Sequence, residues 1–200
     1  MPRPSLSLVS HPRQLAALVS PVRQELLDVL ARVDAVSLAE LGGLLGRPAD
    51  GLYYHVRVLE RSGLIEPAGE RRSAGRREAL YRAVASQFAL RYAPAPARHA
   101  RAVNGVVGAM LRLGARDFRR ALHRAGTGLD GPDRDLWALR TTGWLRPADV
   151  RRVNRLIRTL AEFTARRRPP GRLYALSVLL TPLDHRNNTT GRRPRRKERS

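Results

Sequence analysis

The chain has 200 residues, and 42% of them are hydrophobic, which is enough to build the core of one domain of ordinary size or of two small ones. It contains no cysteine, so disulfides, thiolate zinc sites, iron–sulfur clusters and cysteine nucleophiles are excluded, and a cytoplasmic location is expected. No apolar run is long enough to span a membrane, and the first residues lack the apolar stretch of a secretory signal.

The formal net charge of +21 indicates a polyanionic partner, most simply a nucleic acid. All but one of the basic residues are arginines, a skew that coding bias also produces, so the distribution of the charge matters more than its sum. Residues 1–90 carry only +3, whereas residues 91–126 carry +7. The two ends, residues 1–11 and 184–200, are expected to be a flexible N-terminus and a disordered basic tail.

Apolar residues recur at helical spacing from Pro12 to Val33, and Ser20-Pro21 divides this stretch into two helices, because proline is favoured in a first helical turn. Ser37-Leu38-Ala39-Glu40 has the pattern of a capping box, in which the serine oxygen accepts a backbone N–H and the glutamate reaches back. A short helix is therefore expected to begin there. It should end at Gly46, which can adopt the left-handed turn.

The next helix is predicted to begin at Pro48 and to end at Gly63. One of its faces is expected to be buried. It carries the apolar residues Leu52, Val56 and Leu59, and His55 shares it. Two short strands, at 64–66 and 78–84, should then flank an arginine-rich loop at 69–77. This succession of helices followed by a basic hairpin predicts a winged helix-turn-helix over residues 12–92.

In this order the pieces resemble the ArsR-type (arsenic-repressor-like) winged-helix regulators of bacterial transcription, over residues 15–85. Four stretches carry the resemblance: Ser20 to Leu27, Ser37 to Leu41, Leu52 to Ile65 and Gly75 to Arg82. The resemblance implies a homodimer that represses transcription, with one helix of each subunit in successive major grooves. Metal-sensing members of the family bind their metal through cysteines, which this chain lacks. Because its five histidines are also scattered, no metal and no cofactor is expected.

The outward face of the helix at 48–63 is the expected reader of DNA. Arg57 would bind a guanine edge or a phosphate, and Tyr53 and Tyr54 would contact base methyl groups, sugars or phosphates. Asp50 and Gly51 lie near the start of the same helix, where Asp50 is better suited to stabilise the first turn. A solvated helix face is the alternative, but two adjacent exposed tyrosines without a partner are unusual.

The hairpin loop would place up to four cations on the adjacent DNA backbone or minor groove: Arg71, Arg72, Arg76 and Arg77. A solvated loop in an arginine-rich protein is the alternative. Ser37 is a further candidate for a phosphate contact, since a helix N-terminus attracts anions, although its capping role alone explains it.

Residues 97–125 are predicted to form one long linking helix. Its apolar stripe is expected to pack against a second copy of the chain, through residues that include Val103, Val107, Met110, Leu111 and Phe118. Packing within the monomer is the alternative.

Residues 134–183 are predicted to form a strand–helix–strand unit, with strands at 136–145 and 173–180, which resembles the C-terminal extensions of larger members of the family. Trp137, Trp144 and Tyr174 either pack in its core or line a pocket for an unknown small-molecule effector. The predicted fold is therefore mainly α with a small β-wing: a winged helix-turn-helix, a long dimerisation helix and a small α+β C-terminal unit.

Taken together, these features predict a sequence-specific regulator of transcription that binds double-stranded DNA as a homodimer. The alternative is a winged-helix module that binds RNA or another protein without specific recognition of a duplex. An enzyme is not expected, because the sequence has no nucleophile elbow, no glycine-rich phosphate loop with a lysine and no metal-ligand motif.

Overall fold

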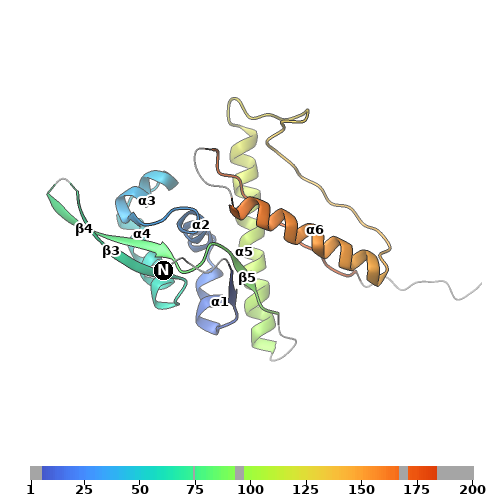
Figure 1. Ribbon diagram of the computed structural model, residues 1–200, viewed down its shortest axis with the longest axis horizontal. Helices are drawn as coiled ribbons and strands as arrows, with labels where there is room; N and C mark the ends of the chain where they lie inside the picture. Colours follow the sequence, from blue (N-terminus) through green and yellow to red (C-terminus); the bar gives the residue numbers. More distant parts are fainter. Residues whose placement is uncertain (1–5, 74, 93–96, 167–170, 184–200) are drawn as a thin grey trace, which may run out of the picture.

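The computed structural model describes residues 6–73, 75–92, 97–166 and 171–183, and it combines helices with two small sheets (Figure 1). In chain order the elements are β1 (Ser7–Val9), α1 (Pro12–Leu18), α2 (Pro21–Leu30), β2 (Val36–Ser37), α3 (Leu38–Leu45), α4 (Asp50–Arg61), β3 (Ile65–Ser73), β4 (Arg76–Ala83), β5 (Phe88–Leu90), α5 (Ala97–Leu122) and α6 (Pro147–Arg166). The basic tail predicted at 184–200 lies outside the described residues.

The helices α2 and α3 begin where the sequence predicts. Pro21 occupies the first turn of α2 after Ser20. At α3, the Ser37 hydroxyl accepts the Glu40 N–H at 3.3 Å, and Glu40 Oε2 accepts the Ser37 N–H at 2.9 Å, which confirms the capping box. Gly46 then ends α3 in the left-handed conformation, with φ of 61°.

The turn after α3 passes unusually close to that helix. A Cβ atom built on Gly42 would lie 2.7 Å from the carbonyl oxygen of Arg47, so a larger residue at position 42 would force the turn to move. The Arg47 N–H donates to the Gly42 carbonyl at 2.9 Å. This contact helps to fix where α4 begins relative to α3.

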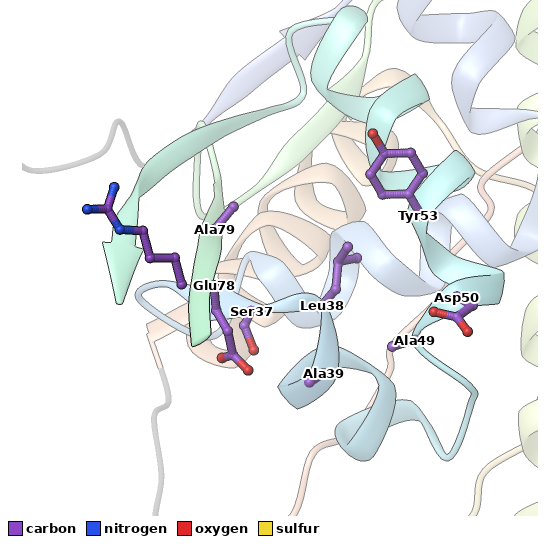
Figure 2. A pocket seen from close by; sticks show the side chains of 9 residues that line it. Ser37, Leu38, Ala39, Ala49, Asp50, Tyr53, Glu78 and Ala79 are labelled. Carbon is purple, nitrogen blue, oxygen red and sulfur yellow. The ribbon is translucent and has the colours of Figure 1, made fainter. Parts of the chain in front are cut away.

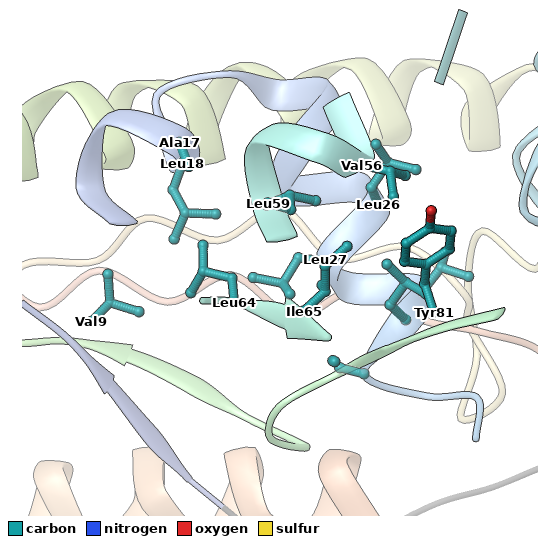
Figure 3. Close-up of a cluster of buried hydrophobic side chains, with 14 of the residues drawn as sticks. Val9, Ala17, Leu18, Leu26, Leu27, Val56, Leu59, Leu64, Ile65 and Tyr81 are labelled. Carbon is teal, nitrogen blue, oxygen red and sulfur yellow. The ribbon is translucent and has the colours of Figure 1, made fainter. Parts of the chain in front are cut away.

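The apolar faces of α1, α2 and α4 meet in one core (Figure 3). Leu52, Val56 and Leu59 of α4 are all buried in it. Leu64 and Ile65 continue the same core directly after α4. Burying one such side chain stabilises the fold by about 1.5–3 kcal/mol, so this stripe holds α4 with its opposite face turned outward.

The strands β3 and β4 form an antiparallel hairpin that projects from the helices (Figure 1). Ser73 pairs with Arg76, and Gly75 between them has φ of 78°, the conformation that a tight turn requires. The prediction of a loop over residues 69–77 is therefore wrong, because the backbone ladder continues almost to the tip. β2 pairs with the other edge of β4, which joins the hairpin to the start of α3.

The expectation of a flexible N-terminus over residues 1–11 is wrong for residues 7–9. They form β1, which pairs in parallel with β5, and Val9 is buried in the core. The side chain of His11 then accepts the Arg13 N–H and caps α1. A strand this short has no recognisable periodicity, and its partner comes from a distant part of the chain.

The long helix α5 packs along α1 and α2 through its buried residues Val103, Val106, Ala109 and Leu113. Val103 is therefore an intrachain core residue, which corrects its assignment to a dimer contact. Val107 packs against the same core, and Met110 is half-buried. Leu111 and Phe118 remain exposed on another face of the helix.

A cluster of charges joins α5 to the helices before it. Glu25 of α2 accepts two hydrogen bonds from Arg116 of α5, at 2.6 and 3.1 Å, and one from Arg47 at 2.9 Å. Arg116 also contacts Asp117 at 2.8 Å. Because the Glu25 side chain is only 15% exposed, water screens these pairs incompletely.

The C-terminal region differs from the predicted strand–helix–strand unit. The helix is present as α6, but 136–145 and 173–180 are extended segments without ladder pairing to any described residue. Trp137, Trp144 and Tyr174, predicted to lie in a core or a pocket, are exposed instead. A strand needs a neighbour for its backbone groups, and the described part of a single chain supplies none here.

Candidate nucleic-acid interface

The outward face of α4 carries two adjacent exposed tyrosines and an arginine. Tyr53 and Tyr54 are 55% and 62% exposed, and Arg57 lies one turn beyond Tyr53. Helical geometry places these side chains opposite the buried Leu52 and Val56. The amphipathic sequence of α4 thus positions the predicted readers on an accessible surface.

Arg57 is held on this surface by an exposed ion pair. Its Nη1 atom lies 2.6 Å from Glu60 Oε2, one turn along the helix. Exposed pairs of this kind contribute at most about 1 kcal/mol, so a stronger anionic partner can displace Glu60. Arg61, which sequence reasoning left out of the candidate site, is exposed beside them and donates to the Arg57 carbonyl.

His55 lies behind this face and not on it. Burial, and then the nearby guanidinium groups of Arg23 and Arg47, lower the pKa of His55, which favours the neutral imidazole. Its ring contacts that of Tyr54 edge to face, with 5.6 Å between the centroids. His55 Nδ1 is buried without a hydrogen-bond partner among the described residues. These surroundings favour a structural role for His55.

A groove of about 570 Å³ separates the start of α4 from the hairpin (Figure 2). Its walls come from the N-terminal ends of α3 and α4 and from β4. Tyr53 and Asp50 lie on the α4 side, and Arg77 and Glu78 on the hairpin side. The groove thus brings together, in one concave surface, parts of α4 and of the hairpin that sequence reasoning treated as separate contacts.

The hairpin arginines are not equivalent. Arg71 Nη2 lies 2.7 Å from Glu40 Oε1 and 3.7 Å from Glu78 Oε2, so Arg71 ties the hairpin to the capped end of α3. Arg77 pairs loosely with Glu70, at 3.8 Å, and is largely exposed. Arg72 is exposed, with no ion pair to any described residue, whereas only the backbone of Arg76 is described. Arg72 and Arg77 are therefore the most accessible described cations of the hairpin.

Carboxylates at the groove restrict where an anion can lie. The Ser37 N–H and then Arg71 lower the pKa of Glu40, so this carboxylate is charged at neutral pH, next to the start of α3. Asp50 and Glu78 add two further acidic groups to the groove walls. These carboxylates repel a polyanion from the groove walls, so the exposed arginines of the hairpin are its favoured contacts.

Two of the predicted site residues are placed differently from the rest. Ser37 is only 2% exposed and its hydroxyl is used in the α3 cap, which corrects its assignment as a phosphate contact. Gly51 is exposed in the first turn of α4, and a Cβ atom there would meet open space. Gly51 therefore leaves room for a close approach to the start of α4.

None of the described helices is both long and apolar enough to cross a membrane. Nor do three or more histidine, aspartate or glutamate side chains of the described ranges gather in a way that could hold a metal ion.

Comparison with known proteins identifies the segment that presents this surface. Residues 18–68 match the family model of a helix-turn-helix domain, a family that includes ArsR-type regulators, and no curated protein sequence matches the chain. The match covers about a quarter of the chain, from the end of α1 through α4 into β3. Residues 18–68 therefore form a helix-turn-helix domain, with α3 and α4 on either side of the tight turn.

Proposed function

We propose that the protein is a sequence-specific regulator of transcription that binds double-stranded DNA as a homodimer. The observation that carries this proposal is the outward face of α4, the helix after the tight turn, where Tyr53, Tyr54 and Arg57 are exposed side by side. In helix-turn-helix proteins the second helix of the motif lies in the major groove. The resemblance to the ArsR-type regulators further suggests repression as the outcome.

The dimensions of α4 suit this role. A helix with its side chains is about 10–12 Å wide, and the major groove is about 12 Å wide. With α4 in the groove, Arg57 would leave Glu60 and bind a guanine edge, a contact that discriminates by about 1–3 kcal/mol. Tyr53 and Tyr54 would contact thymine methyl groups or the sugar–phosphate backbone.

The hairpin then acts as the wing. Its exposed Arg72 and Arg77, with Arg76, would contact the neighbouring backbone or minor groove, while Arg71 keeps the hairpin attached to α3. Each phosphate neutralised adds about 0.9 to the slope of log affinity against log salt concentration. The wing would thus contribute affinity without sequence information.

Dimerisation would place two copies of α4 about 34 Å apart, one turn of DNA, as reading two half-sites requires. The exposed residues Leu111 and Phe118 lie on one face of α5, seven residues apart, and suit a helix contact across a twofold axis.

The test is selection of bound fragments from random duplex DNA, followed by titration of the selected site. We expect a palindromic consensus, and we expect Arg57→Ala to lower the affinity for it by about 10-fold to 100-fold while changing the affinity for random duplex much less. Arg155→Ala, which removes an exposed arginine of α6, is the matched control and should change neither affinity.

Two results would contradict the proposal. If the selection enriches no duplex sequence, the protein does not recognise a specific site. Tighter binding to single-stranded RNA than to any duplex would favour the alternative module, because exposed tyrosines also stack on unpaired bases.

A further inference from the structure

The C-terminal third of the chain exposes large apolar side chains on two extended segments, 136–145 and 173–180. Trp137 and Trp144 of the first segment are 69% and 79% exposed. The second segment exposes apolar side chains along almost its whole length: Leu173, Tyr174, Leu176, Val178, Leu179 and Leu180. Monomeric soluble proteins rarely leave so many large apolar side chains uncovered within two short segments.

The residue pattern of 173–180 is typical of an internal strand. Large apolar residues occupy both alternating sets, for example Leu176 and Leu180 in one and Leu173 and Leu179 in the other. Strands that are apolar on both faces belong to sheets covered on both sides. However, no backbone hydrogen bond joins 136–145 or 173–180 to another described residue. An uncovered strand edge of this kind is a template for pairing with another chain.

The start of the second segment is nevertheless anchored. Arg172 Nη1 donates to Asp135 Oδ2 at 2.9 Å, and the Tyr174 hydroxyl donates to Asp135 Oδ1. Farther along, Ser177 lies against α5, because a Cβ atom at Gly114 would be 3.9 Å from its Oγ atom. The segment is thus held in place beside the helix that carries the proposed dimer contacts, so one partner can cover both.

The exposed tryptophans and leucines supply much of the apolar area that a stable interface needs. Covering a tryptophan removes up to about 250 Å² from water, so Trp137 and Trp144 alone offer roughly 350 Å² per chain. A standard interface buries about 800 Å² on each partner. The leucines of 173–180 and the exposed Leu156 and Leu160 of α6 add further apolar area to that of the two tryptophans.

We propose that a second copy of this chain covers the surface, and that the 173–180 segments of the two copies pair as strands across the twofold axis. The inference deepens the homodimer of the proposed function and rests on it. Rotation about a twofold axis reverses the direction of a strand, so the two segments pair antiparallel. The N–H groups of each segment donate to the carbonyl oxygens of the other. The resulting two-stranded sheet would lie beside the face of α5 that carries the proposed dimer contacts.

The absence of native cysteine makes a cross-linking test clean. Single cysteines are placed one at a time at each position from 174 to 179, and the full-length chain is oxidised. A disulfide needs Cα atoms about 4.4–6.8 Å apart. In an antiparallel pair only the one or two positions at the axis meet this limit. We therefore expect covalent dimer at one or two adjacent positions and background levels at the others.

Ala16→Cys on the exposed side of α1 is the matched control and should remain uncross-linked. A chain that is dimeric by light scattering but cross-links at no position of the scan would overturn the inference. A uniform yield across all six positions would overturn it too, because it indicates random collisions.

A second measurement does not depend on cysteines. Leu176→Arg should raise the dissociation constant of the dimer about 100-fold in sedimentation, whereas Leu176→Met should leave it nearly unchanged. Circular dichroism checks that the helices are retained. An unchanged dissociation constant for a folded Leu176→Arg variant would refute the strand pairing.

The inference and the proposed function fail separately. A dimer that selects a palindromic duplex but gives no cross-link would refute the strand pairing and leave the proposed function standing. A protein that cross-links at the axis but enriches no duplex would refute specific DNA recognition and leave the strand pairing standing.

Discussion

Replacing Glu25 with glutamine is expected to lower the free energy of unfolding by about 2 kcal/mol. Glu25 accepts three charge-assisted hydrogen bonds, two from Arg116 and one from Arg47, and its side chain is only 15% exposed. Each such bond contributes about 1.5–3 kcal/mol. Glutamine keeps one acceptor oxygen, and Arg116 keeps Asp117, so only part of the sum is lost.

Both arginines are partly exposed, so water weakens their bonds to Glu25. The expected loss in the free energy of unfolding is therefore close to the contribution of one such bond. For a chain of this length, 2 kcal/mol corresponds to a fall of about 4–8 °C in melting temperature. The assay is thermal unfolding followed by circular dichroism. All variants are compared at one protein concentration, because association also raises the melting temperature.

Glu66→Gln is the matched control. Glu66 pairs with Arg82 at 2.7 Å, but this side chain is 43% exposed, so the same substitution should cost no more than about 1 kcal/mol. If Glu66→Gln lowers stability as much as Glu25→Gln, or if Glu25→Gln has no effect, burial of the Glu25 cluster is not what joins α5 to the helix-turn-helix domain.

Three further predictions concern the turn, the wing and the dimer. Gly42→Ala should destabilise the domain and weaken DNA binding, since the added Cβ atom meets the Arg47 carbonyl at 2.7 Å; unfolding and titration curves equal to those of the wild type would refute this. Changing Arg76 and Arg77 together to alanine should reduce the salt slope of binding by up to about 2 units on every duplex, and an unaltered slope would exclude the wing from the interface. Leu111→Asp should dissociate the dimer in sedimentation, because it places a charge on the exposed stripe of α5, and a dimer that persists would exclude this face.

The elements predicted from sequence are those whose causes are local. The capping box at Ser37 and the left-handed Gly46 depend on side chains within a few residues, so their chemistry can be recognised before the fold is known. The outward position of Tyr53 and Tyr54 follows in the same way from the spacing of the buried residues of α4.

Predictions that depended on distant partners were less successful. β1 needs β5, and the ladder of β3 and β4 replaces a predicted loop because its register is set by pairing. Helical periodicity identified an apolar stripe on α5, but it could not distinguish the side that α1 and α2 cover, which includes Val103, from the side that remains exposed.

The sequence by itself determined the order of the helices, the tight turn between α3 and α4 and the residues that α4 turns outward, because backbone preferences and amphipathic spacing act over a few residues. Only the tertiary structure decided which cations are accessible. Arg71 is engaged by Glu40, whereas Arg72 has no ion pair to a described residue, although the two are neighbours in the chain. It also left 173–180 extended and without a strand partner in the described part of the chain, since burial and pairing depend on surfaces brought together from distant segments.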